Sequence, residues 1–456
     1  MNIKVGIIGG SGYTGIELLR ILHLHKSAKV AVITSRALEG KKVSEIFPSM
    51  SGISDLEYSL PDDKALYECN IIFFATPHGV AMNSANSFIN KGIKVVDFST
   101  LLPGPLASLF LAETGAEVIK IEKPEVGDEM RSSYPKWGDQ SVSFSILNRG
   151  KKSLSLDLKE PNSLKILEPL IKKADIVIEQ FRPGVMKRLG LDYKSIKKIN
   201  KKIIYVSITG YGQKGPKSMI AGHDLNYISN TGLLSLSMGD VDNTVVPPAL
   251  IADIAGGSYP AVINILLALR KRDTDQKGCF IDISMSDNLF PFMFWGLGSG
   301  FAKDDWPSNS DSILSGGSPR YNIYRTSDRG YVAAAPLEDR FWNKFCEVID
   351  LPKKYINIED NQKEIIQKVR DLIILKDKNY WAKVFNKADC CCSIVKSMEE
   401  AISDNHFKVR KVFSKKLTND EGQEISALPI PIDNQFRKGK RVEKAPKLGI
   451  HNKLFF

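Results

Sequence analysis

The stretch Gly92-Ile93-Lys94-Val95-Val96-Asp97-Phe98-Ser99 divides the chain into two parts with different sequence patterns. Before it, a glycine-rich loop joins a short apolar run to an amphipathic stretch. After it, apolar runs typical of strands alternate with helical patterns over most of the remaining chain. We therefore predict that these residues form a strand and that this strand marks a splice point between two folded units.

The N-terminal part begins with the apolar run Lys4–Ile8, and its amphipathic stretch contains Leu18, Leu19 and Leu22. The loop between them reads Gly9-Gly10-Ser11-Gly12-Tyr13-Thr14-Gly15. A strand, a glycine loop and a helix in this order are typical of a dinucleotide-binding site, because the amides at the helix start bind anions. In this interpretation Gly10 permits the tight turn, Gly12 lets the backbone approach the pyrophosphate, and Gly15 allows close packing of the helix.

A second predicted strand, residues 30–34, ends in Ser35 and Arg36. Folds that prefer NAD usually carry an acidic residue there for the ribose hydroxyl. A hydroxyl and a guanidinium suit a 2′-phosphate instead, so NADP is favoured over NAD. The predicted cofactor contacts are Gly10, Ser11, Gly12, Thr14, Gly15, Ser35 and Arg36.

This part resembles the NAD(P)-binding domain of the N-acetyl-gamma-glutamyl-phosphate reductases. The resemblance rests on the glycine loop, on Thr34-Ser35-Arg36 and on Ala75-Thr76-Pro77-His78-Gly79-Val80. That family uses a nucleophilic cysteine in a later catalytic domain, and no segment of this chain resembles its surroundings. Cys69 precedes an apolar run and is interpreted as a small buried hydrophobe. The resemblance therefore implies a fragment that retains a nucleotide-binding fold without reductase catalysis.

From Gly92 onward the chain resembles the family III CoA-transferases, and among them most closely the alpha-methylacyl-CoA racemases. The resemblance rests on blocks in the family's order: residues 102–105, 115–122, 148–153, 181–188, 209–213, 221–227, 251–257 and 445–449. Both parent families carry a strand similar to Gly92–Ser99 at this place. A recombination or an assembly error there would leave the downstream strand intact, and the sequence leaves both origins open.

The alternation after Gly92 predicts a parallel α/β sheet, and the part from Tyr321 onward predicts two strands around residues 327–330 followed by helices. The predicted fold class is α/β, with a Rossmann-like fragment followed by the family III CoA-transferase fold. The expected domains are the reductase-like fragment (1–91), a large α/β domain (92–310), a small α+β domain (311–420) and a C-terminal return segment (421–456). The resemblance further implies an interlocked homodimer.

The composition is ordinary for a globular protein, with 43% hydrophobic residues. No apolar run reaches the roughly 20 residues that span a bilayer, so we expect no membrane span and a cytoplasmic location. The formal net charge is +11, but the lysines are not interleaved with aromatic residues and no recognition motif accompanies them. We therefore expect no nucleic-acid partner, and basic charge would also steer an anionic CoA thioester.

The six cysteines are Cys69, Cys279, Cys346 and the run Cys390-Cys391-Cys392. None shows C-x-x-C spacing or an adjacent histidine. The sequence therefore predicts neither a disulfide framework nor a metal site. The run lies in an apolar stretch that continues to Val395, and it is interpreted as packing.

Three polar residues after the splice strand are candidates for chemistry. His223 lies in a loop of small residues, from which a polar side chain can reach a cleft. Asp253 stands at the head of a predicted helix, where the helix dipole favours a carboxylate, and Glu338 begins another helix. From the residues alone, Asp253 and Glu338 also fit helix caps, and His223 also fits a structural histidine.

The resemblance implies catalytic roles for these residues, because His223, Asp253 and Glu338 fall on the racemases' catalytic histidine, aspartate and glutamate. A racemase removes the proton beside the thioester carbonyl from one face and returns it to the other, so two acid–base groups must flank one carbon. The implied arrangement has His223, supported by Glu338, on one side and Asp253 on the other. Backbone amides near Gly256 and Gly257, or at the helix start, would stabilise the enolate.

A CoA-transferase would use Asp253 as a nucleophile that takes the acyl group and then hands CoA to another acid. That reaction has no role for His223 or Glu338, and transferases of the family commonly lack this histidine. An acyl-CoA racemase is therefore favoured, with a CoA-transferase as one alternative. A second alternative is a fusion product that keeps only a reductase remnant.

For the CoA moiety the resemblance suggests Lys123, Arg149, Arg182 and Arg188, whose cationic heads suit a diphosphate and a 3′-phosphate. Racemases often carry arginine where this chain has Lys123, so a point charge replaces a bidentate fork there. An ordinary surface cation is the alternative reading of each position.

Overall fold

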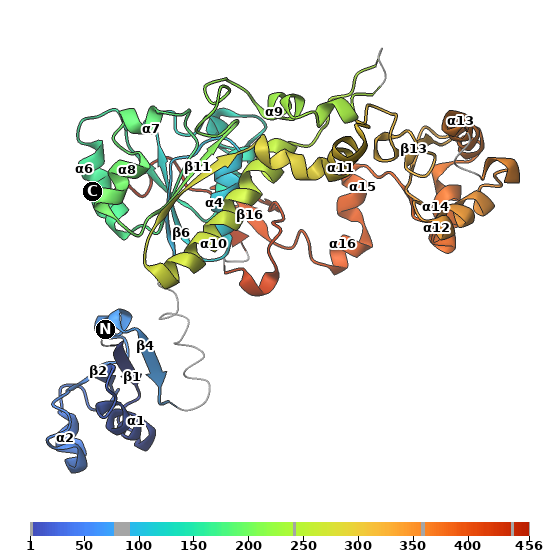
Figure 1. Cartoon of the computed structure of the whole chain (residues 1–456). Coiled ribbons are helices and arrows are strands. Elements are labelled where there is room, and N and C mark those ends of the chain that lie inside the picture. The colour runs from blue at the N-terminus through green and yellow to red at the C-terminus, as the bar shows by residue number, and fades with distance from the viewer. Residues whose placement is uncertain (1–2, 77–91, 240–242, 357–360, 439–441, 456) are drawn as a thin grey trace. The chain divides into compact units, whose positions relative to one another are not determined.

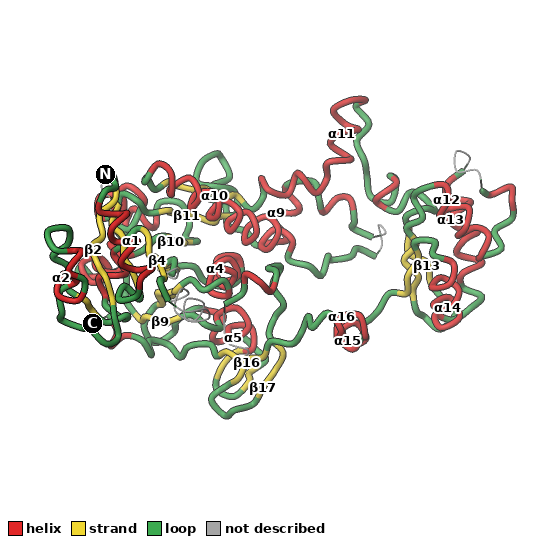
Figure 2. The backbone as a smooth tube through the Cα atoms, turned by 90° about the horizontal axis from the view of Figure 1, so that it is seen from below, coloured by secondary structure: helices red, strands yellow, loops and turns green. Residues whose placement is uncertain are grey.

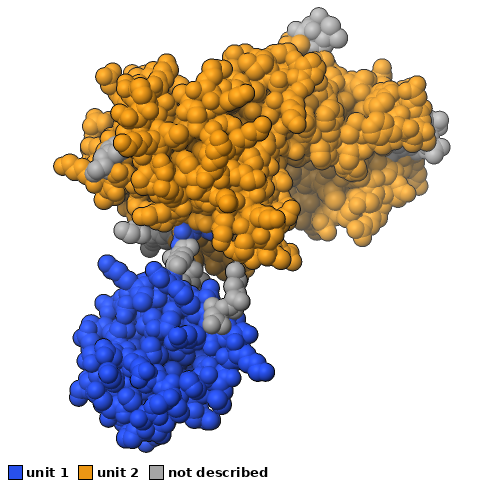
Figure 3. All heavy atoms as spheres, turned by 60° about the vertical axis from the view of Figure 1, so that its left-hand side comes forward, with its two compact units in different colours: residues 1–93 blue, residues 94–456 orange. Residues whose placement is uncertain are grey.

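The computed structural model describes residues 3–76, 92–239, 243–356, 361–438 and 442–455. The chain forms two compact units, residues 1–93 and residues 94–456 (Figure 3). The predicted splice point therefore falls within two residues of the observed division.

The N-terminal unit contains a four-stranded sheet in the order β3-β2-β1-β4. Its strands are β1 (Ile3–Ile8), β2 (Ala28–Thr34), β3 (Tyr58–Ser59) and β4 (Ile71–Phe74), and its helices are α1 (Tyr13–His23) and α2 (Val43–Ile46). All three strand pairings are parallel. Val5, Ile7 and Leu19 pack in its core, as expected for a Rossmann-like fragment. Among the described residues this sheet ends at β4.

The strand that follows the junction, β5 (Lys94–Asp97), belongs to a second sheet. This six-stranded sheet has the order β12-β11-β10-β5-β6-β9, and every pairing in it is parallel. Its other strands are β6 (Glu117–Glu122), β9 (Lys152–Ser155), β10 (Ile176–Glu179), β11 (Ile204–Thr209) and β12 (Cys279–Ser284). The chain runs from β5 outward to β6 and β9 and then returns to β10 on the other side of β5. The direction of winding thus reverses between β5 and β10.

Helices cover both faces of this sheet (Figure 1). On one face α6 (Ser163–Lys173), α7 (Val185–Arg188) and α8 (Tyr193–Ile199) pack with Val96, Phe98 and Val177. On the other face lie α4 (Pro103–Glu113) and α10 (Tyr259–Asp275), and α5 (Val142–Asn148) packs against α4. Nearly every residue of α4 is buried, which its almost wholly apolar sequence permits. The result is a doubly wound architecture, and it confirms the parallel α/β sheet that the sequence predicted.

A smaller α+β part follows, with its own core around Tyr324, Trp342 and Phe345. Its antiparallel strands are β13 (Asn322–Arg325), β14 (Tyr331–Ala334) and β15 (Cys392–Ile394), and Figure 2 shows α12 (Asp339–Val348), α13 (Gln362–Ile373) and α14 (Lys378–Ala388) gathered beside β13. The predicted strands around residues 327–330 are therefore confirmed.

The remaining elements connect these parts. They are β7 (Lys136–Trp137), β8 (Gln140–Ser141), α9 (Asp224–Asn230), α11 (Phe294–Lys303), α15 (Met398–Ser403), α16 (Asn405–Val409), β16 (Lys416–Thr418), β17 (Glu424–Ser426) and β18 (Val442–Glu443). Strand β16 pairs with both β17 and β18, so the expected boundary at residue 420 falls inside one small sheet. The tail returns to β9, where Ser153 N donates to His451 Nδ1 (3.1 Å) and Ser155 N donates to Asn452 Oδ1 (2.9 Å).

A fully buried ionic network lies at the carboxyl end of β5. The side chains of Asp97, Lys120, Asp128 and Lys151 are all 0% exposed. Lys120 Nζ lies 2.8 Å from Asp128 Oδ2 and donates to Ser99 O at 2.6 Å. Ser108 Oγ donates to Asp97 Oδ2 at 2.5 Å, and Lys151 Nζ lies 3.6 Å from the same oxygen. Two cations thus balance two carboxylates in the interior, as buried charges require.

The network also makes the stability of this unit depend on pH. Burial alone would raise the pKa of Asp97, but the charges of Lys120 and Lys151 and the hydroxyls of Ser108 and Ser99 outweigh it and lower the pKa below 3.8. A carboxyl whose pKa is lower in the folded state stabilises the fold above its ordinary pKa. This contribution is lost as the pH falls through its folded value.

We predict that Lys120→Met lowers the free energy of unfolding of the C-terminal unit by about 3–5 kcal/mol, because it leaves the buried carboxylate of Asp128 without a cation and removes one of the two near Asp97. All five tryptophans lie in this unit, so their fluorescence during guanidinium unfolding reports on it alone. Lys165→Met, an exposed site on α6, is the control and should cost no more than about 0.5 kcal/mol. Equal effects of the two changes would contradict the role assigned to the network.

Candidate active site

A cavity of about 490 Å³ opens at the carboxyl ends of the central strands. Its walls are Thr100, Leu101 and Pro103 after β5, residues 180–183 after β10, residues 208–211 at the end of β11, and Ser218, residues 220–223, Asn226, Tyr227, Asp253 and Met285. It therefore lies at the point where the winding of the sheet reverses. Open parallel α/β sheets bind their ligands at this switch point, since the loops from the two neighbouring strands diverge there.

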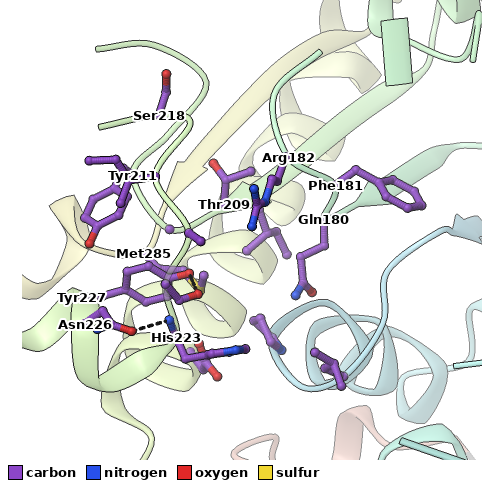
Figure 4. A pocket seen from close by; sticks show the side chains of 18 of the residues that line it. Gln180, Phe181, Arg182, Thr209, Tyr211, Ser218, His223, Asn226, Tyr227 and Met285 are labelled. Carbon is purple, nitrogen blue, oxygen red and sulfur yellow. Dashed lines mark hydrogen bonds between the residues drawn. The ribbon is translucent and has the colours of Figure 1, made fainter. Parts of the chain in front are cut away.

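His223 reaches this cavity from the start of α9. It is the residue that precedes the helix, and its backbone N–H donates to Asn226 Oδ1 at 3.0 Å. Figure 4 shows the side chains of His223, Gln180 and Arg182 directed into the same hollow. The His223 side chain is exposed. It is therefore not packed in the core, although its place as the residue before α9 also fits a structural role.

Asp253 lines the same cavity from a π-helical segment, Ala252–Ser258, that leads into α10. Single π-helical turns are rare and are frequent at functional sites. The backbone N–H of Asp253 donates to Asp224 Oδ1 at 2.9 Å. The side chain of Asp224, rather than that of Asp253, thus accepts a hydrogen bond from the start of this helix. The cap interpretation of Asp253 is wrong, and its carboxylate is left to face the cavity.

The surroundings of Asp253 favour its protonated form. The pKa of Asp253 is raised to about 6, first by burial and second by the neighbouring Asp224 carboxylate, while the positive charge of His223 lowers it in part. Burial also raises the pKa of the adjacent Tyr227 to about 12, so this phenol stays neutral at physiological pH. An aspartate with such a pKa exchanges protons near neutral pH, which is what general acid–base catalysis needs.

Glu338 is not brought to this cavity within one chain. It precedes α12 in the smaller α+β part and is absent from the walls of the cavity. Among the described residues no hydrogen bond or ion pair joins it to His223. The predicted helix start is confirmed, but the support of His223 by Glu338 is not seen inside a single copy.

Gly256 and Gly257 do not line the cavity either. A Cβ on Gly256 would lie 2.3 Å from Met285 O, and one on Gly257 would lie 3.1 Å from the Met285 side chain and 3.2 Å from Pro103. These glycines allow the π-helical segment to pack against Met285 and α4. The expectation that amides near them face the enolate is therefore not supported by this geometry.

The four cations expected at CoA differ in their surroundings. Arg182 is exposed and lines the cavity, and the exposed Lys123 and Arg188 stand at the end of β6 and on α7. Arg149 is different, with a side chain only 1% exposed. Its Nε donates to Glu113 Oε1 at 2.6 Å, and its other nitrogens donate to Ile146 O and Leu428 O. This geometry corrects the expectation that Arg149 contacts CoA, because its guanidinium is already hydrogen-bonded inside the fold.

The glycine loop of the N-terminal unit has the expected order but a different turn residue. Gly9, not Gly10, has the positive φ of 84° that the turn requires. A Cβ on Gly10 would lie 2.1 Å from the Ile33 side chain, and one on Gly15 would lie 2.5 Å from Gly10 Cα. Close packing therefore explains Gly10 and confirms the expectation for Gly15. Gly12 precedes α1 and remains open to an approaching ligand.

The other predicted nucleotide contacts surround this loop. Ser35 Oγ donates to Ser11 Oγ at 3.1 Å, which ties the end of β2 to the loop. Thr14 and Arg36 are exposed. Cys69 Sγ donates to Ala65 O at 3.7 Å and packs beside Ile8 and Leu66. Pro77-His78-Gly79-Val80 of the reductase-like motif lies outside the described residues.

Sequence reasoning missed two residues that line the cavity, Tyr227 and Gln180, and a third, Asp224, whose carboxylate accepts from the backbone N–H of Asp253. Asp224 was passed over although it directly follows His223, and Tyr227 lies one turn further along α9. Gln180 Oε1 accepts from Gly104 N at 3.0 Å and so joins the loop after β10 to the start of α4. Its only sequence signal is its place directly after a buried strand, where functional side chains of parallel sheets gather.

The described residues contain no cluster of histidine, cysteine or acidic side chains that could hold a metal ion. One continuous helical segment in them, Ala252–Asp275, has the length and composition to cross a membrane, which differs from our expectation that no segment does. The π-helical and α-helical parts join to give that length. The evidence for a span is weak, because a core helix of a globular protein passes the same test.

Comparison with known proteins places this site in a family. The model of CoA-transferase family III matches residues 91–452. Human alpha-methylacyl-CoA racemase is 32% identical over 75% of this chain and 86% of its own length. Acetyl-CoA:oxalate CoA-transferase of Acetobacter aceti is 34% identical over 58% of this chain and 67% of its own length. The chain belongs to CoA-transferase family III.

The comparisons also confirm the fusion and the fold. The model of the semialdehyde dehydrogenase NAD-binding domain matches residues 4–120, and N-acetyl-gamma-glutamyl-phosphate reductase of Ruthia magnifica is 58% identical over 97 residues. That match covers 21% of this chain and only 28% of the reductase. The two family models overlap at residues 91–120, around the junction strand. A CaiB/BaiF family protein from Brucella suis has a similar structure (TM-score 0.66, 26% identity) over 80% of this chain and 97% of its own.

We predict that Asp224→Asn lowers the pKa of Asp253. Asparagine keeps an oxygen that accepts from Asp253 N but removes a negative charge that favours the protonated form. The titration of the carboxyl carbon of Asp253 can be followed by NMR in protein labelled at aspartate, with Asp253→Asn identifying the resonance. Asp273→Asn, an exposed site on α10, is the control and should leave the titration unchanged. A midpoint that stays near 6 in Asp224→Asn would refute the influence of Asp224.

Proposed function

We propose that the chain is an acyl-CoA racemase of the alpha-methylacyl-CoA type, which epimerises 2-methylacyl-CoA thioesters at the α-carbon. The observation that carries this proposal is that His223 and Asp253 line one cavity at the switch point of the sheet. The similarity to human alpha-methylacyl-CoA racemase over three quarters of the chain supports it.

In the proposed mechanism the α-carbon lies between the two side chains. One of them removes the α-proton, and the other delivers a proton to the opposite face of the resulting enolate. The pKa of about 6 at Asp253 lets its side chain both accept and donate a proton near neutral pH, which a reaction that runs in both directions requires.

Glu338 completes this mechanism only from a second copy of the chain. We propose a homodimer in which the partner's small part carries its glutamate to His223 and orients the imidazole. Apolar side chains of α10 and α11 support an interface, since Leu266, Leu267, Phe294 and Phe301 are 56%, 59%, 73% and 78% exposed. Exposed apolar surface of this extent on neighbouring helices is typical of surfaces that another chain covers.

A CoA-transferase is the second candidate, and the similarity to acetyl-CoA:oxalate CoA-transferase supports it. In that reaction the Asp253 carboxylate would attack the thioester carbonyl and form a mixed anhydride, from which CoA passes to another acid. The imidazole of His223 would then have no chemical role. The presence of His223 in the cavity is the reason to prefer the racemase.

The deciding experiment incubates the purified full-length chain in D2O with one stereoisomer of 2-methylacyl-CoA and a free carboxylic acid. A racemase gives α-deuterium and loss of stereochemistry, detected by mass spectrometry and chiral chromatography. New thioester of the added acid without α-exchange would establish the transferase instead. If neither α-deuterium nor new thioester forms, both assignments are refuted for this substrate class.

We predict that His223→Ala and Asp253→Asn each abolish racemisation. Each variant should also lose α-deuterium exchange from one stereoisomer only, and the two variants should lose it from opposite stereoisomers. Each variant retains one base, which can still exchange the proton on its own face. Loss of one general acid–base group should slow the affected isomer about 10²-fold or more. His406→Ala, an exposed histidine on α16, is the control. If both variants retained α-deuterium exchange from the same stereoisomer, the two-sided arrangement would be contradicted.

For the CoA moiety we propose that Arg182, with Lys123 and Arg188, binds the phosphates. Arg182→Gln should weaken CoA binding by about tenfold or more, as expected for a lost charged hydrogen bond, without changing the melting temperature. Arg149→Gln should lower the melting temperature, because it leaves buried Glu113 with one cation fewer. Calorimetric titration with CoA and thermal unfolding measure the two effects. A melting temperature lowered only by Arg182→Gln would contradict these assignments.

We further propose that the N-terminal unit can still bind NADP. Its described residues fit the phosphates of a dinucleotide, since the loop at Gly12 is open and the first turn of α1 presents amides to it. The exposed Arg36 suits a 2′-phosphate. The cofactor would supply hydride chemistry, but the described residues place no nucleophilic cysteine beside this loop. A cytoplasmic location remains part of the proposal.

A further inference from the structure

A second cavity, of about 290 Å³, lies on the face of the six-stranded sheet that α7 and α8 cover. It is bounded by the end of β10, by parts of β11 and β12, by α7 and by the start of α8. Of the three cations proposed for CoA, only Arg182 is among its walls. Lys123 stands at the end of β6, on the far side of β10 and β5 from β11. This cavity is therefore distinct from the acyl-CoA cavity but shares Arg182 with it.

Three aromatic rings form one wall of this second cavity. The ring centroids of Tyr193, Tyr205 and Phe280 lie 5.7–6.0 Å from one another. Tyr205 is 2% exposed, whereas Phe280 on the edge strand β12 is 42% exposed. Rings this close leave no room for a ligand between them, so a ligand lies against the open side of Phe280. A flat aromatic surface of this kind favours a planar ring that stacks on it.

The same cavity contains a buried carboxyl. Glu179, at the end of β10, is 4% exposed and is among the walls. Phe181 N donates to its Oε2 at 2.9 Å, and the hydroxyl of Ser207 also hydrogen-bonds with it. Gln213 Nε2 donates to Ser207 Oγ at 2.7 Å. In the part of the chain that the structure describes, Glu179 forms no ion pair. A buried carboxyl without a cation costs free energy, which makes it a candidate for binding a ligand.

The surroundings of Glu179 favour its neutral form. Its pKa is raised to about 7, first by burial, and the charge of Asp282 adds to this effect, while the hydrogen bonds with Ser207 and Phe181 lower it in part. A protonated carboxyl donates one hydrogen bond and accepts others. Adenine offers a matching pair, because its amine donates and its neighbouring ring nitrogen accepts. Guanine offers two adjacent donors on its Watson–Crick edge, which suit an ionised carboxylate instead.

Cations stand at the rim of the cavity. Arg182, Lys187 and Lys194 are exposed and are among its walls. Asp192 is also there, but its Oδ1 accepts from Ser195 Oγ at 2.6 Å. Guanidinium and ammonium groups are the side chains that hold phosphate. The cavity thus combines a stacking surface, a group that pairs with a base, and cations for a phosphate.

We propose that this cavity binds an adenine nucleotide other than CoA, with AMP as its simplest form. The base stacks on Phe280 and pairs with Glu179, and the phosphate lies among Arg182, Lys187 and Lys194. Because Arg182 also lines the acyl-CoA cavity, a nucleotide bound here should weaken the binding of CoA. This last consequence rests on the proposed function, but the nucleotide site does not.

Calorimetric titration of the full-length chain with AMP tests the site. All titrations use the Gly12→Glu background, whose added carboxylate repels phosphates from the glycine loop of the N-terminal unit. One AMP should bind per chain, and GMP should bind at least about tenfold more weakly. Absence of AMP binding, or tighter binding of GMP than of AMP, would overturn the proposal.

The stacking surface has a matched pair of variants. Phe280→Ala should raise the Kd of AMP about tenfold or more, as expected for one lost stacking contact. Phe407→Ala, a ring on α16 of similar exposure (37%), is the control and should leave the Kd unchanged. Thermal unfolding checks that both variants are folded. A Kd that Phe280→Ala does not change would place AMP elsewhere and overturn the proposal.

Two substitutions of Glu179 test its pairing with the base. Glu179→Gln should keep the Kd of AMP within about threefold, because an amide also offers a donor beside an acceptor. Glu179→Leu should raise it about tenfold or more. Equal losses in the two variants would overturn the role of the neutral carboxyl, and no loss in Glu179→Leu would overturn the pairing. If Glu179→Leu does not fold, the Phe280 variant still decides whether the site exists.

The phosphate contact is tested by comparing AMP with adenosine. Lys194→Gln should raise the Kd of AMP about threefold or more and leave that of adenosine unchanged. Lys198→Gln, at an exposed lysine one turn further along α8, is the control and should change neither. An equal effect of Lys194→Gln on AMP and adenosine would overturn the phosphate assignment.

The coupling between the two cavities has its own readout. Saturating AMP should raise the Kd of CoA, and saturating CoA should raise that of AMP by the same factor without excluding it. Complete exclusion, with CoA binding weakened by Phe280→Ala, would make this cavity part of the CoA site and overturn the proposal. Unchanged affinities would overturn the shared use of Arg182. Absence of CoA binding would instead overturn the proposed function and leave the AMP result standing.

Discussion

The buried carboxylate of Asp97 fixes the strand on which the rest of the C-terminal unit depends. A fully buried charge is tolerated only beside opposite charges and hydrogen-bond donors. Lys120 on β6 and Lys151 before β9 supply these charges, and Ser108 on α4 supplies a hydroxyl. All of these partners lie in the C-terminal unit. The junction strand therefore belongs to the second sheet, although the models of both parent families extend across it.

This placement of β5 creates the candidate active site. Because β6 lies on one side of β5 and β10 on the other, the loops after β5 and β10 separate and leave a cavity at their ends. Gln180 bonds the loop after β10 to the first turn of α4. The stretch after β11 adds His223, and the π-helical segment before α10 adds Asp253. Two titratable side chains, His223 and Asp253, thus line one cavity at the carboxyl ends of the strands.

Local sequence patterns predicted the strands, the glycine loop and the junction, because each depends on residues that are close in the chain. Contacts between distant residues were not accessible in the same way. Arg149 has the residue type and the position of a phosphate ligand, yet it pairs with Glu113 and with a carbonyl of Leu428, 279 residues away. Gly9 and Gly10 are adjacent glycines, and only the observed backbone shows which of them makes the turn.

The placement of Glu338 has a different cause. Its helix start was correctly predicted, but local patterns do not show whether its side chain reaches His223 in the same copy or, as proposed, in a partner copy. The choice between racemase and transferase depends on the same geometry, since only a racemase needs His223 and Asp253 on opposite faces of one carbon.

The most direct measurement is a crystal structure of the full-length chain with a non-hydrolysable analogue of 2-methylacyl-CoA. The account predicts that the α-carbon lies between the His223 imidazole and the Asp253 carboxylate, within about 3.5 Å of each and on opposite faces. An α-carbon out of reach of His223, with the carbonyl carbon directly in front of the Asp253 carboxylate, would contradict it and identify a CoA-transferase.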